Sequence, residues 1–293
     1  MKPFIKTKKG EAYNASIEDF LISKKGLSLK GKVSLIFTSP PYPLIVPKKY
    51  GNKQGEEYLN WISNISQGLS HLLTEDGSLV VEIGNAWNKG QPTMSTLPLE
   101  TLVSIAKSSN LKICQQFVWH NPGKLPGPAT WVNVKRERIT DSFTHIWWYS
   151  KSEHPKADNR KVLTPYTSAM KNLIKNKKYN HGTRPSGHKI SEKGFLNDNG
   201  GSIPRSTLIY ANTGFDTDYR DWCKEKGVPQ HPARMPIDLA NFFINFLTDK
   251  SDIVLDPFGG SCTTGKSAEE LKRKWICVEQ RKEYLIGAKG RFK

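Results

Sequence analysis

The run Ser39-Pro40-Pro41-Tyr42 places a hydroxyl group, a stiff backbone and an aromatic ring side by side. The apolar residues Val33, Leu35, Ile36 and Phe37 before it predict a short buried strand. In open α/β sheets, ligands bind at the carboxyl ends of such strands. Because proline has a fixed φ and no amide N–H, the backbone after Ser39 is rigid and its carbonyls remain free acceptors. Ser39 and the Pro40 carbonyl could accept hydrogen bonds from an amine on a flat ring, and Tyr42 could stack on that ring. The alternative is a proline-capped strand that leads into a loop.

A second candidate site is Asp256-Pro257-Phe258-Gly259-Gly260-Ser261, which comes after the predicted strand Asp252–Leu255. A strand, a tight glycine turn and a helix predicted from Thr263 direct backbone N–H groups and a helix dipole toward a ligand. Glu279 ends the next predicted strand, 23 residues after Asp256. A carboxylate at that place suits the hydroxyl groups of a ribose, as in nucleoside sites on doubly wound sheets.

Residues 260–267 also match the phosphate-loop pattern G-x-x-x-x-G-K-[ST]. Phosphate-loop enzymes need further strands after the loop, including one with an acidic residue for magnesium. Only 26 residues come after Ser267, and neither Asp256 nor Gly259 would have a role in a triphosphate site. The nucleoside interpretation is favoured, and the phosphate loop stays as the alternative.

The composition indicates a partner with many negative charges. The chain has 293 residues and a formal net charge of +17, and its apolar runs are too short to span a bilayer. Nucleic acid is therefore favoured over membrane. The four cysteines are scattered and the histidines lack metal-ligand spacing, which predicts a reducing compartment and no metal site. The lysine-rich N-terminus lacks the apolar core of a signal peptide, so we expect a cytoplasmic, nucleoid-associated protein.

Predicted strands and helices alternate at short spacing, which favours a parallel sheet with helices on both faces. A helical pattern over 56–73 precedes a turn at Asp76-Gly77 and a strand over 78–83. The hydrophobic pattern thins between about 151 and 227, and 156–205 holds 11 lysines and arginines against 3 aspartates and glutamates. The alternatives for this region are a solvated, partly disordered insertion and a module that binds phosphates and reads bases; the charge favours the second.

Together these motifs resemble the amino-group DNA methyltransferases that use S-adenosylmethionine. Ser39-Pro40-Pro41-Tyr42 is similar to the catalytic motif in its cytosine N4 form, whereas Asp or Asn in the first position is the usual adenine N6 form. The order of motifs, catalytic first and cofactor loop last, resembles the permuted β group and its restriction–modification members. The resemblance therefore implies that Ser39 and the Pro40 carbonyl accept the amine hydrogens, and that Tyr42 stacks on a flipped base.

The same resemblance implies a cofactor site built from both ends of the chain. Its members would be Asp256, Pro257, Phe258, Gly259, Gly260, Ser261, Thr263, Glu279, His231 and Ser16. His231 belongs to a His-Pro-Ala-Arg-Met-Pro motif that precedes the cofactor strand. Ser16 departs from the family, which usually has Gly-Asp where this chain has Ala15-Ser16, so a charged contact is lost.

The implied fold is an α/β, circularly permuted Rossmann-like methyltransferase sheet, with a loop-rich basic target-recognition insertion. We expect a catalytic half at 1–150, a target-recognition region at 151–228 and a cofactor-binding half at 229–293, with residues 10–16 pairing beside the C-terminal half. Basic residues in two regions are expected to contact double-stranded DNA: Lys135, Arg136, Arg138, Lys175, Lys177, Lys178 and Arg184. Restriction–modification membership also implies an endonuclease that shares the recognition site without a stable complex. The alternatives to cytosine N4 methylation are adenine N6 or RNA methylation and a non-catalytic DNA-binding protein on the same fold.

Overall fold

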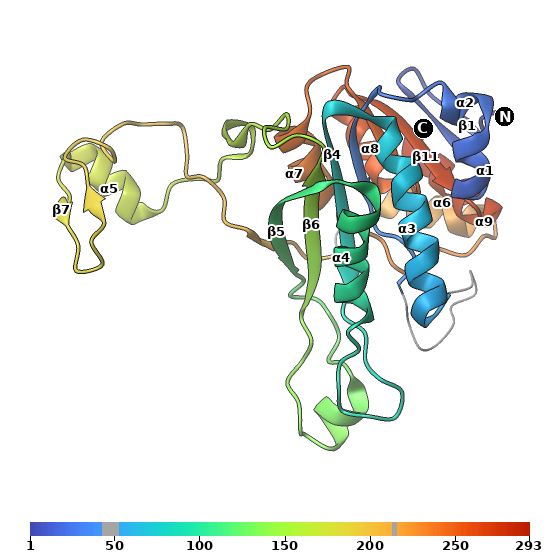
Figure 1. The fold of residues 1–293 in the computed structure, drawn as a ribbon, viewed down its shortest axis with the longest axis horizontal. Coiled ribbons are helices and arrows are strands. Elements are labelled where there is room, and N and C mark those ends of the chain that lie inside the picture. The colour runs from blue at the N-terminus through green and yellow to red at the C-terminus, as the bar shows by residue number, and fades with distance from the viewer. Residues whose placement is uncertain (43–52, 213–215) are drawn as a thin grey trace. The chain divides into compact units, whose positions relative to one another are not determined.

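The computed structural model describes residues 1–42, 53–212 and 216–293. The chain divides into two compact units, one of residues 1–157 with 206–293 and one of residues 158–205. The first unit holds the large sheet (Figure 1). The second holds the 3₁₀ turn Asn159–Val162, helix α5 (Ser168–Asn176) and the small hairpin of β7 (Gly182–Thr183) and β8 (Lys189–Ile190).

Nine strands form the sheet of the main unit in the order β1-β2-β11-β10-β3-β4-β6-β5-β9. Their bounds are β1 Ile5–Lys6, β2 Gly10–Asn14, β3 Val33–Thr38, β4 Leu73–Gly84, β5 Lys112–His120, β6 Phe143–Ser150, β9 Thr207–Ile209, β10 Ile253–Asp256 and β11 Lys274–Glu279. The strands from β2 to β4 run parallel, β6 runs antiparallel between β4 and β5, and β9 is parallel to β5. The predicted parallel sheet is confirmed in its centre, and the antiparallel β6 makes the whole sheet mixed.

The two ends of the chain meet in this sheet. Strand β2 from the N-terminal end pairs in parallel with β11 from the C-terminal end, with Gly10 opposite Trp275 and Asn14 opposite Glu279. A Cβ on Gly10 would lie 2.3 Å from the Trp275 ring, so only glycine allows this close pairing. The permuted arrangement expected for residues 10–16 is confirmed.

Helices cover both faces of the sheet. The helices are α1 Ile17–Ile22, α2 Lys24–Leu27, α3 Gly55–Leu72, α4 Leu97–Ser109, α6 Thr217–Glu225, α7 Ile237–Leu247, α8 Thr263–Glu270 and α9 Lys282–Ala288, with a π-helix at Thr130–Val134 and a 3₁₀ turn at Lys289–Phe292. Successive side chains of β3 point to opposite faces. Ile36 joins the core cluster under α3 and α4, whereas Phe37 contacts Phe243 of α7 with ring centroids 5.1 Å apart.

The predicted turn at Asp76-Gly77 is wrong, because both residues lie within the long strand β4. The pairing of β4 with β3 shifts register here: Val33 lies opposite Leu73, but Leu35 lies opposite Ser78. A Cβ at Gly77 would lie 2.9 Å from the Val33 carbonyl oxygen. The turn-like residues therefore form an irregularity in a continuous strand, as glycine in a strand often does.

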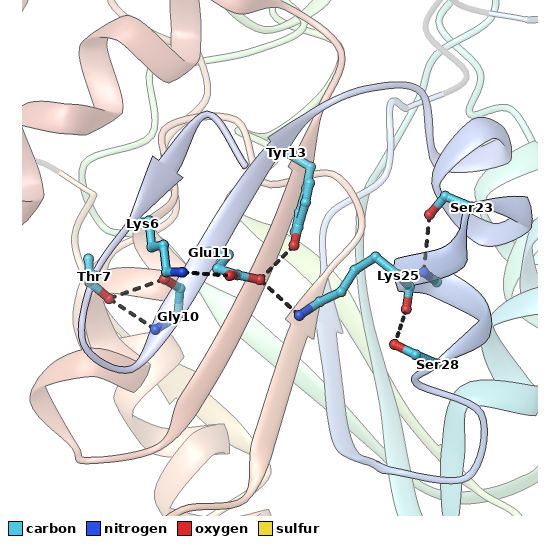
Figure 2. Close-up of polar contacts among 9 residues, drawn as sticks. Lys6, Thr7, Gly10, Glu11, Tyr13, Ser23, Lys25 and Ser28 are labelled. Atoms are coloured by element: carbon cyan, nitrogen blue, oxygen red, sulfur yellow. Dashed lines mark hydrogen bonds and ion pairs between the residues drawn. The ribbon is translucent and has the colours of Figure 1, made fainter. Parts of the chain in front are cut away.

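A partly buried cluster of polar groups ties the N-terminal hairpin to α2 (Figure 2). Glu11 accepts hydrogen bonds from the Tyr13 hydroxyl at 2.6 Å and from Lys25 Nζ at 2.8 Å, and Lys6 Nζ lies 3.9 Å away. The hydrogen bond from Lys25 lowers the pKa of the Glu11 carboxyl below its ordinary value. The hairpin that supports β11 is thereby fastened to the helix beside it.

Candidate active site

The carboxyl ends of β3, β10 and β11 open into a cavity of about 620 Å³. Every residue predicted for catalysis or for cofactor binding lines it: Ser16, Ser39, Pro40, Pro41, Tyr42, His231, Asp256, Pro257, Phe258, Gly259, Gly260, Ser261, Thr263 and Glu279. The motifs lie more than 200 residues apart in the sequence and meet because β3 and β10 are neighbours in the sheet. The structure thus brings both predicted sites to one cavity, and the roles of the individual residues remain predictions.

A buried carboxylate lies behind the Ser-Pro-Pro-Tyr run. The Ser39 hydroxyl donates to Glu82 Oε2 at 2.6 Å, and the Tyr42 hydroxyl donates to Glu82 Oε1 at 2.6 Å. Glu82 belongs to β4 and is 2% exposed. Burial raises the pKa of the Glu82 carboxyl, against the opposing effect of the hydrogen bonds from Ser39 and Tyr42. The shorter contact of Ser39 is with Glu82, and the Tyr42 hydroxyl lies 3.4 Å from the Ser39 oxygen. With its hydrogen donated to Glu82, the Ser39 oxygen can accept a hydrogen bond from a ligand.

Glu82 is a site residue that sequence reasoning missed. Its signal is a single acidic residue inside an otherwise apolar strand, Leu79-Val80-Val81-Glu82-Ile83. An ionisable residue among buried strand positions is expected only where it has a partner. Its partners, Ser39 and Tyr42, follow the neighbouring strand β3, so the pattern of β4 alone could not reveal them.

The ring of Tyr42 packs on Gly84, at the end of β4. A Cβ at Gly84 would lie 2.8 Å from Tyr42 Cε2, so glycine makes room for the ring. Tyr42 is therefore held at two points, by its hydroxyl on Glu82 and by its ring on the backbone of β4. A ring fixed in this way at the cavity wall can stack on a planar ligand.

Asp256 braces the glycine loop rather than presenting a free carboxylate. Its two oxygens accept hydrogen bonds from Thr38 Oγ1 and Thr264 Oγ1, each at 2.8 Å, and Oδ1 also accepts from the amide of Phe258 at 3.1 Å. Burial raises the pKa of the Asp256 carboxyl. Thr38 ends β3 and Thr264 lies in the first turn of α8, so Asp256 joins the catalytic strand to the cofactor loop.

Glu279 lies at the other side of the glycine turn. Its Oε2 accepts from the amide of Gly260 and its Oε1 from the amide of Arg281, each at 2.8 Å. Burial raises the pKa of the Glu279 carboxyl. Gly260 has φ +50°, a conformation that favours glycine, and its Cα faces the His231 ring. Two backbone amides thus fix a carboxylate at the cavity wall, where it can accept hydrogen bonds from a ligand.

Ser16 and His231 also have partners within the protein. The Ser16 hydroxyl accepts from the Asp19 amide at 3.0 Å and caps α1. The His231 ring lies edge-on to Tyr284 with ring centroids 4.6 Å apart, and the His231 amide donates to the Tyr219 hydroxyl. Both residues line the cavity, so their contacts within the protein fix them at its wall.

Aromatic residues that were not expected from the sequence complete the cavity. Trp61 of α3 lies against Phe258, with ring centroids 5.6 Å apart, and donates from Nε1 to Glu18 at 2.7 Å. The buried hydroxyl of Tyr58 and Nη1 of Arg281 make no hydrogen bond within the described part of the chain, and both residues line the cavity. These two atoms are shielded from solvent, and the polar groups available at the cavity wall are instead those of the glycine loop and of Glu279. The cavity therefore fits a ligand with a planar apolar part and several polar groups.

The phosphate-loop alternative does not agree with the position of its lysine. Lys266 Nζ forms an ion pair with Glu270 at 3.1 Å, one turn further along α8. Lys266 does not line the main cavity but a smaller one beside Lys6 and Lys8. A phosphate-loop lysine must reach the nucleotide phosphates, so the pattern at 260–267 is a chance match.

The basic residues predicted to contact DNA lie in both units. Lys135, Arg136 and Arg138 belong to the segment between β5 and β6 of the main unit. Lys175, Lys177, Lys178 and Arg184 belong to the unit of residues 158–205, on and after α5. Within the predicted target-recognition region 151–228, β9 and α6 are part of the main unit.

The described residues contain no group of three or more His, Cys, Asp or Glu side chains that could hold a metal ion. All four cysteines are free thiols. No helix in the described ranges is both long enough and apolar enough to cross a bilayer.

Comparisons with known proteins show the family of the chain. Residues 33–289 match a family model described as DNA methylase. The chain is 41% identical over 293 residues to the type II methyltransferase M.PvuII of Proteus hauseri, in an alignment that covers 99% of this chain and 86% of the relative. It is 27% identical over 283 residues to the orphan methyltransferase M.BamHII of Bacillus amyloliquefaciens, with 89% of each chain covered.

Solved structures show the same fold. The structure of the PvuII DNA methyltransferase (cytosine-N4-specific) matches with a TM-score of 0.80 and 34% identity, over 100% of this chain and 89% of that chain. A complex of M1.HpyAVI with SAM matches with a TM-score of 0.56 at 20% identity, over 97% and 99% of the two chains. At that identity the second match concerns the fold alone.

Proposed function

This chain belongs to the DNA methylase family, and from that premise we propose that it transfers a methyl group from S-adenosylmethionine to the N4 amine of cytosine in duplex DNA. The observation that carries the proposal is that Ser39 and the glycine loop share one cavity. The cytosine-N4 specificity of the PvuII relative agrees with serine at the first position of the catalytic motif. The motif residues are intact and assembled, which speaks against a binding-only protein.

The cavity fits S-adenosylmethionine by the chemistry of its walls. Glu279 would accept hydrogen bonds from the ribose hydroxyls, and Phe258 and Trp61 would cover the adenine. The backbone from Gly259 to Ser261 and the side chain of His231 would enclose the methionine end. When bound, S-adenosylmethionine supplies an electrophilic methyl group on a positively charged sulfur.

The role of Ser39 rests on its hydrogen bond to Glu82. The lone pair of the cytosine N4 amine is delocalised into the ring, which makes the amine a poor nucleophile. Because Ser39 donates its own hydrogen to Glu82, its oxygen can accept one amine hydrogen while the Pro40 carbonyl accepts the other. Two acceptors so placed favour a pyramidal nitrogen whose lone pair points away from them, toward the methyl group.

Glu82 also offers a destination for the proton that the amine must lose. The amine nitrogen gains a methyl group and releases one proton, and Ser39 is hydrogen-bonded to a buried carboxylate. Burial raises the pKa of Glu82, so its carboxylate is a better proton acceptor than an exposed one. The proton passes from the amine to the Ser39 oxygen as the Ser39 hydrogen passes to Glu82.

The target base must leave the duplex to reach this cavity, as in other enzymes that modify a base. We propose that Lys135, Arg136 and Arg138 contact the DNA backbone from the main unit. Residues 151–228, with Lys175, Lys177, Lys178 and Arg184, would read the recognition site. The net charge of +17 supports a polyanionic substrate. The type II relatives support a cytoplasmic role beside a restriction endonuclease that shares the site without binding stably.

Nucleoside mass spectrometry of DNA incubated with the protein and S-adenosylmethionine tests the proposal. N4-methylcytosine is expected from the wild type and from Ser28→Ala, a serine at the C-terminal end of α2 outside the cavity, but not from Ser39→Ala. N6-methyladenine as the product would show that the chain is an adenine enzyme. Absence of a methylated base in DNA of varied sequence, while DNA is bound, would support the binding-only alternative.

A further inference from the structure

Two loops extend from the same end of the sheet as the cavity, where β4 and β5 end and β6 begins. One, residues 85–96, joins β4 to α4, and the other, residues 121–142, joins β5 to β6. The register places both beside the catalytic motif, because Gly84 lies opposite Thr144 and also contacts Tyr42. Figure 1 shows them running well beyond the end of the sheet, in teal and green.

A polar network fastens the base of these loops. Asp141 accepts from Asn85 Nδ2 at 2.9 Å and from Lys124 Nζ at 3.0 Å, and its amide donates to the Gly127 carbonyl. The His145 ring lies 3.1 Å from the side-chain oxygen of Asn85. The base of the 121–142 loop is therefore held against the ends of β4 and β6.

Three apolar side chains of the 121–142 loop are largely exposed. Ile139 is 89% exposed, Leu125 is 84% exposed and Val134 is 76% exposed. Arg138, next to Ile139, is fixed by hydrogen bonds from Nε to the Pro92 carbonyl and from Nη1 to the Glu137 carbonyl. Ile139 thus stands between two anchored residues, Arg138 and Asp141, with its side chain directed into solvent.

We propose that Ile139 enters the DNA duplex beside the target base and occupies the space that the base leaves. The inference rests on the proposed function, because a methyltransferase of this kind must extrude its base. Apolar side chains inserted between base pairs are a known means of unstacking DNA. Lys135, Arg136 and Arg138 precede Ile139 in the loop with positive charge that complements phosphates, which favours DNA over a protein partner. Burial between bases would also remove Ile139 from water.

The test compares two duplexes that differ at one position. Both carry the cytosine that the wild type methylates, identified by mapping N4-methylcytosine in reacted DNA. In one duplex this cytosine pairs with guanine, and in the other it faces an abasic site, where it leaves the stack at lower cost. Single-turnover methylation rates are measured for the wild type, Ile139→Ala, Ile139→Leu and Ile22→Ala. Ile22 is a matched control, because it is an isoleucine, 76% exposed, on α1 outside the cavity.

Ile139→Ala is expected to slow methylation of the paired duplex by roughly tenfold to a hundredfold, since base stacking contributes on this scale. On the abasic duplex, the methylation rate of Ile139→Ala should stay within about threefold of the wild-type rate. Ile139→Leu and Ile22→Ala should behave as the wild type on both.

Fluorescence of pyrrolocytosine, a cytosine analogue that pairs with guanine, in place of the target cytosine provides a second readout. The wild type should raise it on binding, and Ile139→Ala should raise it less at equal DNA occupancy. If Ile139→Ala slows methylation equally on both duplexes, or does not slow it on the paired duplex, the insertion of Ile139 is refuted. The proposed function would remain intact. If mapping finds no N4-methylcytosine in DNA that has reacted with the wild type, both the role of Ile139 and the proposed function are overturned.

Discussion

Replacement of Glu82 by glutamine tests the central contact of the site. The amide has nearly the shape of the carboxylate but carries a donor where Glu82 has only acceptors. The Ser39 and Tyr42 hydroxyls, which both donate to Glu82, would then have to share one amide oxygen. If the amide nitrogen of the new glutamine side chain faces Ser39, its N–H donates to the Ser39 oxygen. That hydrogen bond would compete with the one from the cytosine amine.

The expected cost is that of losing one preorganised hydrogen-bonding group at a reacting centre. Such losses reduce kcat by about a hundredfold to a thousandfold, or ~3–4 kcal/mol. Because Glu82 does not line the cavity, the affinity for S-adenosylmethionine should stay within about threefold of the wild type. Single-turnover formation of N4-methylcytosine and calorimetric titration with S-adenosylmethionine measure the two quantities.

The pH dependence gives a second, independent prediction for Glu82. Burial raises the pKa of its carboxyl, so the carboxylate that accepts from Ser39 forms only above that raised value. Activity should therefore fall as the pH drops through the raised pKa, and Glu82→Gln should lack this acidic limb. The contribution of Glu82 to the free energy of unfolding should change in the opposite direction, and decrease as the pH rises. A carboxyl whose folded pKa is raised stabilises the fold below its unfolded pKa and loses that contribution as the pH rises through the folded one.

Glu75→Gln is the matched control for this experiment. Glu75 belongs to the same strand, but its side chain is exposed and pairs with Lys151 at the surface. Its replacement should change neither the rate nor the pH profile. The assigned role of Glu82 is refuted if Glu82→Gln retains a rate within about threefold of the wild type with an unchanged acidic limb.

Three further predictions concern other parts of the structure. Glu279→Gln should weaken S-adenosylmethionine binding by roughly tenfold to a hundredfold in calorimetry, since it removes a charged acceptor; unchanged affinity would contradict the assigned ribose contact. Gly84→Ala should push the Tyr42 ring aside, because its Cβ would lie 2.8 Å from that ring, and lower the methylation rate while leaving cofactor affinity intact. Glu11→Gln should lower the free energy of unfolding in urea by less than ~1 kcal/mol at neutral pH. The lowered pKa of Glu11 means that this difference is present above its unfolded pKa and disappears as the pH falls through the folded one; a difference that persists in acid would contradict it.

Local sequence determined the motifs and the strands that carry them. Two prolines after an apolar run end a strand and stiffen the backbone beyond it, independently of the rest of the chain. The glycine turn after β10 and the carboxylate at the end of β11 likewise depend on residues within a few positions of one another. Alternating strand and helix patterns were enough to predict a parallel sheet with helices on both faces, and the motif resemblance placed both chain ends in it.

Only the tertiary structure decided which side chains meet. The pattern of β4 shows a buried strand with one glutamate, but Ser39 is its neighbour because β3 and β4 pair in one register. The same reasoning explains the wrong turn at Asp76-Gly77, where pairing with β3 keeps turn-forming residues in a strand. Tertiary structure also decides the partner of Lys266. The phosphate-loop pattern predicts that this lysine binds a nucleotide, but on α8 it forms an ion pair with Glu270. Backbone preferences act over a few residues, whereas register and facing side chains depend on strands that are distant in the sequence and close only in the folded sheet.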